Sequence, residues 1–409
     1  MKYTRPNLFY YRMAQIVSWV VATFIFKREL LRNEIKGVKG PYVVIANHQA
    51  KYDFVNLIGI NRRPMTFVIS SSMYNSMPIA PVLNKMGVIP KQQFQTSVKD
   101  MKRIKAVVEA GEPLVIYPAG LMCEDGLSTP IPQATYKFLK WLKADVYVAR
   151  TSGTYFAMPK WARGMRPGRT CLDVYKLFSK EELAELDVDV IKKKTDEALL
   201  FDAYREQETL RVKYKNNRNV EGLEQVLYMC PHCESEFTMQ TKNGDTLVCD
   251  RCGYEQVCDD YALVRNERGI GREVRYASDW SRLIYDKLKE KVARGEETGL
   301  TAETCIHMIG YQKHKFVEVG DGAVTISEKC VQIEGTIRGE AVDLQVPISN
   351  IPTLPFGPGK YLEIQHGEDI YRCVLADGRL VMKFINLVKI FHELSRSEKK
   401  TAAACGGTG

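Results

Sequence analysis

Residues 42–53 read YVVIANHQAKYD, in which five apolar residues run directly into Asn47, His48 and, five positions later, Asp53. A short apolar run of this kind is typical of a strand that is buried on both faces of a sheet. A histidine at the end of such a strand can pair with a carboxylate on the following helix, which leaves its second ring nitrogen free as a general base. A histidine that only caps the edge of the core explains the same pattern.

Further apolar runs surround this strand and alternate with helical segments. We predict strands at 66–69, 114–117 and 145–149, an edge strand at 171–176, and helices at 97–109 and 133–142. Buried strands separated by helices favour an α/β fold with a mainly parallel sheet flanked by helices, which we expect over residues 31–215.

Two loops of this α/β region offer groups that are suited to ligand binding. Residues 87–91 read GVIPK and bring the cation of Lys91 to a tight glycine turn, and residues 116–120 read IYPAG at the end of a strand. Open α/β folds bind ligands at the carboxyl ends of their strands. Lys91 could meet a phosphate there, and a backbone N–H near Gly120 could face a developing oxyanion.

The ordered set NHQAKYD, MGVIPK and IYPAG resembles the motifs of the glycerolipid acyltransferase family, the 1-acylglycerol-3-phosphate acyltransferases, over about residues 10–215. The resemblance implies that His48, held by Asp53, deprotonates an acceptor hydroxyl, which then attacks the thioester of an acyl-CoA or acyl-carrier-protein. The implied acceptor is a lysophospholipid, foremost 1-acylglycerol-3-phosphate. The candidate substrate-binding residues are Asn47, Lys91, Pro118 and Gly120.

Three motif positions differ from the family pattern. Ala50 stands for the serine of the first motif, Lys91 is the cation nearest to the missing arginine of the second, and Ala119 replaces the glutamate of the third. His48 and Asp53 are retained, so acyl transfer is the leading hypothesis. The alternative is a catalytically impaired, membrane-bound lipid-binding scaffold that uses the same fold.

The apolar run at 13–26, MAQIVSWVVATFIF, is flanked by basic residues. As a helix it would rise about 21 Å, which is short of the ~30 Å hydrocarbon core of a bilayer. We therefore expect residues 1–30 to form an interfacial membrane helix, the alternative being a buried packing helix.

The distribution of charge points to anionic partners. Of 58 basic and 49 acidic residues, 27 basic and 10 acidic residues fall in positions 1–180, so the excess of positive charge lies in the α/β region. This favours an anionic membrane surface and a phosphate-bearing substrate, and we expect no nucleic acid. The family resemblance implies a cytoplasmic protein that is peripheral or monotopic on the cytoplasmic membrane face.

Residues 230–233 and 249–252 read CPHC and CDRC, which is a C-x2-C-x15-C-x2-C pattern. Two knuckles of this spacing present four thiolates to one tetrahedral Zn2+, and because protein fills all four positions the ion would be structural. We predict a zinc ribbon over residues 226–262, with the metal ligands Cys230, Cys233, Cys249 and Cys252.

The rest of the chain changes from helix to β pattern. We expect a linker helix within 263–299, followed at 300–397 by short antiparallel strands and an amphipathic C-terminal helix. This order of elements resembles a pleckstrin-homology-type fold. Residues 398–409 are expected to be a disordered tail.

Overall fold

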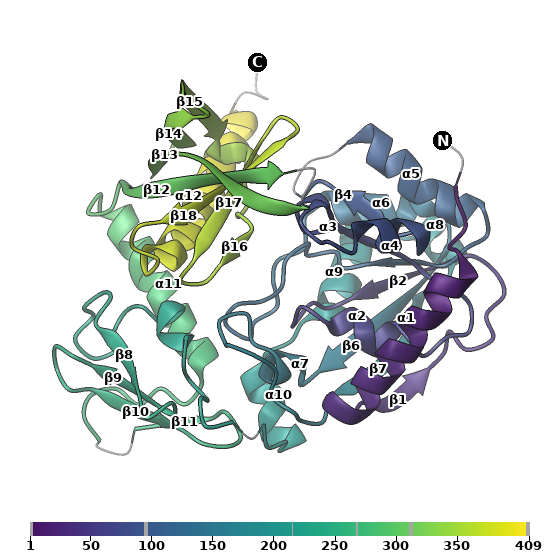
Figure 1. Ribbon diagram of the computed structural model, residues 1–409, viewed down its shortest axis with the longest axis horizontal. Coiled ribbons are helices and arrows are strands. Elements are labelled where there is room, and N and C mark those ends of the chain that lie inside the picture. The colour runs from purple at the N-terminus through teal and green to yellow at the C-terminus, as the bar shows by residue number, and fades with distance from the viewer. Residues whose placement is uncertain (1–2, 94–96, 215, 267–268, 311–313, 406–409) are drawn as a thin grey trace. The chain divides into compact units, whose positions relative to one another are not determined.

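The computed structural model describes residues 3–93, 97–214, 216–266, 269–310 and 314–405, and it divides into two compact units (Figure 1). Unit 1 comprises Met1–Lys160, Gly164–Asn216 and Asp260–Ala262, and unit 2 comprises Trp161–Arg163, Asn217–Asp259 and Leu263–Gly409. Nearly all of the predicted ribbon, the linker and the β module fall in unit 2. The predicted end of the α/β region, residue 215, lies outside the described residues.

Unit 1 is built on a seven-stranded sheet in the order β1-β7-β6-β2-β5-β3-β4. Its strands are β1 (Glu29–Asn33), β2 (Tyr42–Ala46), β3 (Thr66–Ser70), β4 (Ile89–Lys91), β5 (Leu114–Ile116), β6 (Asp145–Ser152) and β7 (Cys171–Phe178). The pair β6–β7 is antiparallel, and the other described pairs in this sheet are parallel. The predicted mainly parallel α/β fold is confirmed.

The prediction that the strand at 171–176 lies at the sheet edge is wrong. β7 has β6 on one side and β1 on the other, where β1 pairs with it in parallel. The sequence of β1, ELLRN, is exposed over most of its length and lacks the alternation that identifies a half-buried strand. Backbone pairing and a two-point contact of Arg32 with Asp173 hold it instead.

Helices cover both faces of this sheet. They are α1 (Leu8–Val20), α2 (Asp53–Ile58), α3 (Ser71–Asn75), α4 (Ala80–Lys85), α5 (Val98–Glu109), α6 (Ala134–Leu142), α7 (Thr154–Ala157), α8 (Lys180–Glu185), α9 (Val188–Leu199) and α10 (Ala203–Leu210). Val43 and Ile45 of β2 pack with α5, α6 and α9, whereas Val44 and Ala46 pack with α1 and α2. Because both sets are buried, the strand carries no polar alternate residue.

The N-terminal helix is longer than the 14-residue run from which we predicted it. α1 begins at Leu8, where the side chain of Asn7 accepts the N–H of Phe9 at 3.0 Å, and it continues through a π-helical turn at Val21–Ile25. The resulting span, Leu8–Ile25, has 18 residues, and by length and composition it is the one span among the described residues that could cross a membrane. Only 17% of this span is buried inside the protein.

Unit 2 contains two antiparallel sheets, in the orders β11-β10-β9-β8 and β15-β14-β13-β12-β18-β17-β16. The first consists of β8 (Met239–Lys242), β9 (Thr246–Cys249), β10 (Glu255–Cys258) and β11 (Val264–Arg265). The second consists of β12 (Gly299–Gly310), β13 (Lys315–Ser327), β14 (Cys330–Ile337), β15 (Glu340–Pro347), β16 (Phe356–Gly357), β17 (Tyr361–His366) and β18 (Asp369–Leu375). The predicted antiparallel module is confirmed.

Two long helices complete unit 2, α11 (Ala277–Ala293) and α12 (Leu380–Cys405). α11 packs against the segment that leads into the first cysteine pair. The indole N–H of its buried Trp280 donates to the carbonyl of Met229 at 2.8 Å. α12 also contacts α11 and extends into the segment 398–409, where we predicted a disordered tail. Residues 406–409 lie outside the described residues.

Candidate active site and metal centre

The loop that follows β2 is fixed by Asn47. Its side-chain amide donates to the carbonyl of Thr151 at 2.8 Å, and its side-chain oxygen accepts the N–H of Thr151 at the same distance. Asn47 is buried, so these two bonds satisfy groups that would otherwise lie unpaired in the core. Asn47, which we predicted to bind substrate, thus links the end of β2 to β6 through two buried hydrogen bonds.

His48 and Asp53 meet as their spacing predicted. The ring Nδ1 of His48 lies 2.9 Å from Oδ2 of Asp53, which also accepts the N–H groups of Gln49 at 2.7 Å and Ala50 at 2.9 Å. The carboxylate is fully buried, whereas 21% of the His48 side chain is exposed. Three donors therefore hold the acid in place, and Nε2 is the ring nitrogen left for a substrate.

Tyr117 lies against the imidazole, with ring centroids 4.5 Å apart and a tilt of 36°. It follows β5, whose residue Ile116 pairs with Ile45 of β2, so adjacent parallel strands deliver the two rings to the same edge. Burial raises the pKa of Tyr117 well above its ordinary value, and the charge of Asp53 adds to the effect, so the phenol stays neutral. We did not assign Tyr117 from the sequence; its place in IYPAG, at the end of the neighbouring strand, was the available signal.

The residues after Tyr117 form a tight turn that closes over the His48 loop. Pro118 leads into Gly120, whose φ of +72° requires glycine and whose N–H donates to the carbonyl of Tyr117 at 3.0 Å. That N–H is engaged in the turn and is not directed at an oxyanion. Further on, the N–H of Cys123 donates to the carbonyl of His48 at 3.1 Å.

Lys91 ends β4, which is separated from β2 by β5 and β3 in the sheet. It is half-buried and donates to the carbonyl of Gln92 at 2.8 Å, and burial lowers its pKa. Gln93 links this loop to its neighbours, since its side-chain oxygen accepts the hydroxyl of Ser70 at 3.0 Å and its amide donates to the carbonyl of Gly120. The loops after β3, β4 and β5 are therefore joined through Gln93, which we did not predict.

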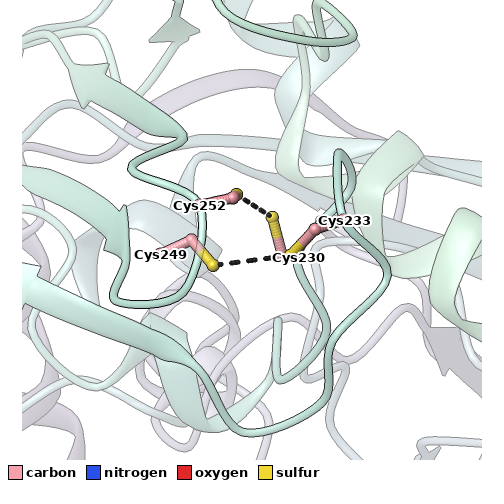
Figure 2. Close-up of side chains that lie close together, drawn as sticks. All are labelled: Cys230, Cys233, Cys249 and Cys252. Atoms are coloured by element: carbon pink, nitrogen blue, oxygen red, sulfur yellow. Dashed lines mark hydrogen bonds between the residues drawn. The ribbon is translucent and has the colours of Figure 1, made fainter.

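The four predicted metal ligands converge in unit 2, as Figure 2 shows. The Sγ atoms of Cys230 and Cys252 lie 3.7 Å apart, as do those of Cys233 and Cys249, and all four lie within 4.8 Å of one another. A tetrahedral ion with Zn–S bonds of about 2.3 Å would set an S–S separation of about 3.8 Å. The cluster can therefore hold a metal ion, and its four thiolates fit Zn2+.

A group of buried and partly buried charges lies beside this metal centre. Glu236 accepts from Lys383 of α12 at 2.8 Å and from Lys291 of α11 at 2.9 Å, and Lys383 also contacts Glu297 at 2.7 Å. Because Glu236 directly follows the first knuckle, these ion pairs join the metal-binding segment to both helices of unit 2.

One side of α1 is unusually apolar and exposed. Its buried residues are Tyr11 and Ser18, and Ala22 follows in the π-helical turn. The large apolar side chains that are exposed on this span are Leu8, Phe9, Met13, Ile16, Val17, Trp19, Val20 and Phe24. Contiguous apolar surface of this extent marks an interaction site.

A comparison with family models agrees with the motifs NHQAKYD, MGVIPK and IYPAG. Residues 8–157 match a model of the acyltransferase family. Among solved structures, the chain is similar to the 1-acyl-sn-glycerophosphate acyltransferase PlsC from Thermotoga maritima, at 15% identity and a TM-score of 0.42, over 49% of this chain and 79% of that chain. It is also similar to the Ran-binding domain of Nup2 from Ashbya gossypii, at 12% identity and a TM-score of 0.19, over 23% of this chain and 99% of that chain. The comparison with curated proteins gave no match.

Proposed function

We propose that the protein transfers an acyl chain from an acyl thioester to the hydroxyl of a lysophospholipid. The match of residues 8–157 to a model of the acyltransferase family supports this proposal. The thioester is carried by CoA or by acyl-carrier-protein, and the foremost acceptor is 1-acylglycerol-3-phosphate. The observation that supports this proposal is the contact of His48 Nδ1 with Asp53, a buried carboxylate that accepts three hydrogen bonds, while 21% of the His48 side chain stays exposed.

His48 acts as the general base in this proposal. Its Nδ1–H donates to Asp53, so Nε2 can take the proton of the acceptor hydroxyl while the hydroxyl oxygen bonds to the thioester carbonyl. The C–S bond then breaks, and the leaving thiolate takes the proton back from Nε2. No covalent enzyme intermediate is needed, because the thioester is already activated. Asp53 holds the ring in place, and its charge stabilises the imidazolium.

The experiment compares wild type with His48→Ala on a panel of lysophospholipids and a labelled acyl thioester. We expect the variant to lose about 10²–10⁴-fold in kcat, the usual contribution of a general base. His366→Ala removes an exposed histidine of unit 2 and should leave the rate unchanged. Equal product from wild type and His48→Ala would rule the proposal out, and retained lipid binding without consumption of the thioester would favour the scaffold alternative.

We further propose that α1 lies in the interface of an anionic membrane, on the cytoplasmic face. One side of the helix packs on the rest of unit 1 through the buried Tyr11, and the side-chain amide of Gln15 donates to the carbonyl of Asn61 at 2.7 Å. A membrane-spanning orientation would break these contacts. An interfacial helix instead keeps them and buries its exposed apolar side chains in lipid.

This membrane proposal is tested by sedimentation with vesicles of phosphatidylcholine and phosphatidylglycerol. The double variant Ile16→Ser, Val17→Ser should bind about 10-fold or more weakly, because each side chain loses roughly 1.5–3 kcal/mol of burial. Leu200→Ser removes an equally exposed apolar side chain elsewhere on unit 1 and is the matched control. Unchanged binding of the double variant would exclude α1 as the membrane contact.

For the four-cysteine cluster we propose Zn2+ in a structural role. Cys230, Cys233, Cys249 and Cys252 would hold it, and with four protein ligands the ion cross-links the fold and takes no part in acyl transfer.

A further inference from the structure

We propose that Gln15 and Arg28 are positioning residues for the His48–Asp53 pair, and that they act through helix α2. This inference rests on the proposed function, since it concerns the geometry of the proposed base. It adds that the helix with the exposed apolar face and the reacting histidine are mechanically linked, although no residue of α1 touches His48 through a described hydrogen bond.

Helix α2 connects α1 and the segment after it to His48, and it has only six residues. It starts at Asp53, the residue that holds His48, and ends at Ile58. At its far end the guanidinium of Arg28 donates to the carbonyl of Asn56 at 2.7 Å. The side-chain amide of Gln15 donates to the carbonyls of Asn61 at 2.7 Å and Ile58 at 3.3 Å. Two side chains from the N-terminal segment therefore satisfy the carbonyls that a helix end leaves without intrahelical partners.

Arg28 is placed for this contact at some energetic cost. Burial lowers its pKa, and no charged group in the described part of the chain offsets that effect. A half-buried cation without a carboxylate partner is unfavourable unless it gains strong hydrogen bonds, and carbonyls at a helix C-terminus are suitable acceptors for a cation. The contact with α2 is thus the interaction that accounts for a buried arginine at this position.

The π-helical turn at the end of α1 sets the direction of Arg28. The N–H of Phe26 donates to the carbonyl of Val21 at 3.1 Å, and the N–H of Arg28 donates to that of Ala22 at 2.8 Å. Ala22 and Phe26 are buried by this winding, and the chain then turns so that Arg28 reaches α2. Turns of this type are frequent at functional sites.

A second link runs to α2 from the same turn. The carbonyl of Phe26 accepts both the N–H of Thr170 at 2.9 Å and its hydroxyl at 3.1 Å. That hydroxyl in turn accepts the side-chain amide of Asn56 at 3.2 Å. Since Asn56 and Asp53 belong to the same six-residue helix, a shift of α1 would be passed on to the carboxylate as a rigid-body movement.

The mechanical consequence for catalysis is large even for a small shift. A misplacement of about 1 Å at a reacting group can reduce a rate by about 10²-fold. We therefore expect Arg28→Met and Gln15→Leu, which keep most of the apolar part of the side chain but remove the donors, to lower kcat by about 10–100-fold. The KM of the acyl acceptor should change less than twofold, because in this proposal both residues act through α2 and not on the substrate. Arg28→Lys should recover part of the rate.

The charge-matched control is Lys36→Met, an exposed lysine beyond β1 with no described side-chain contact to α2. Vesicle sedimentation should be the same for Arg28→Met and Lys36→Met, which separates positioning from membrane binding. A kcat for both Arg28→Met and Gln15→Leu within twofold of wild type would overturn the inference. An equal loss in Lys36→Met would also overturn it.

A measurement without turnover keeps this inference distinct from the proposed function. The proton that His48 Nδ1 shares with Asp53 gives a downfield resonance in the NMR spectrum of protein with 15N-labelled histidine. We expect this resonance to broaden or disappear in Arg28→Met and to persist in Lys36→Met. If wild type transfers no acyl chain but this pattern is seen, the proposed function fails and the positioning role stands; an unchanged resonance in the folded Arg28→Met protein overturns the positioning role alone.

Discussion

The two units each contain a carboxylate that contacts a basic side chain, fully buried in unit 1 and partly buried in unit 2, but the two sites are built in opposite ways. In unit 1, Asp53 takes all three of its donors from the stretch 48–53, and its partner His48 keeps 21% of its side chain exposed. In unit 2, Glu236 takes its donors from Lys291 and Lys383 on two different helices, and the side chain of Lys383 is only 10% exposed.

The difference separates a site that can react from one that can only stabilise. His48 has one nitrogen committed to Asp53 and another directed away from it, so a substrate proton can reach the ring. Lys383 is saturated by Glu236 and Glu297, so it offers nothing to a ligand. A buried ion network of this kind is tolerated because each charge compensates its neighbours, and its loss is felt in the stability of the fold.

The largest expected effect is on unit 2 and follows from metal removal. Chelation, or Cys230→Ser, should unfold the ribbon and disturb the ion network at Glu236, because structural zinc contributes about 10–16 kcal/mol of apparent binding energy to small domains. Calorimetry with metal analysis measures the effect. Cys305→Ser, which removes an exposed thiol outside the cluster, is the control. If the metal-free protein melts like the loaded one, the cluster has no structural role.

The next effect concerns unit 1 and the charge of Asp53. Asp53→Asn keeps the shape of the side chain and can still accept from Gln49 and Ala50, but it removes the charge that stabilises the imidazolium. We expect kcat to fall by about 10³–10⁴-fold with little change in melting temperature. Glu181→Gln, which removes the charge of an exposed carboxylate paired with the exposed Lys180, should change neither quantity. A large loss of stability with a normal rate per folded molecule would mean that the pair is structural, like that of Glu236.

A smaller effect is predicted for the ion network itself. Lys383→Met removes the cation that Glu236 and Glu297 share and leaves the two partly buried carboxylates facing each other. We expect unit 2 to lose about 3–5 kcal/mol of stability while kcat of the folded enzyme is unchanged. Lys289→Met, whose pair with Glu393 is about half exposed on both sides, is the matched control and should cost less than about 1 kcal/mol. Equal melting temperatures of the two variants would contradict the comparison.

The same network gives a pH dependence with a definite sign. Burial alone would raise the pKa of Glu236, but hydrogen bonds from Lys383 and Lys291 outweigh it and hold that pKa below the ordinary glutamate value. A depressed pKa adds stability above the unfolded value of about 4.3, and this stability is lost as the pH falls through the folded value. Denaturation of wild type between pH 6 and pH 3, compared with Glu236→Gln, should show the loss in wild type and a flatter profile in the variant.

Local sequence patterns predicted those features of the fold and the site that depend on residues close together in the chain. The strand YVVIA, the His–Asp spacing of five and the two knuckles of cysteines are all readable within short windows. The pairing of Glu236 with Lys383 spans 147 residues, and only tertiary folding brings these side chains together. Tyr117 and Gln93 escaped assignment for a related reason, since their partners lie on loops that the sheet order, rather than the sequence order, makes adjacent.

The smallest predicted effect tests whether Lys91 belongs to the reacting site or only to the fold. If Lys91 binds the phosphate of the acceptor, Lys91→Gln should raise the KM for 1-acylglycerol-3-phosphate about 10-fold and leave kcat unchanged, as expected for the loss of one charge-assisted hydrogen bond. Burial lowers the pKa of Lys91, so its ammonium is lost at a lower pH than that of an exposed lysine. The KM of wild type should therefore rise with pH before the ordinary lysine value of about 10.4 is reached, and that rise should be absent in Lys91→Gln. Lys99→Gln, at an exposed position on α5, should behave like wild type. Identical pH profiles for wild type and Lys91→Gln would mean that Lys91, like Lys383, has a structural role and does not bind the acceptor.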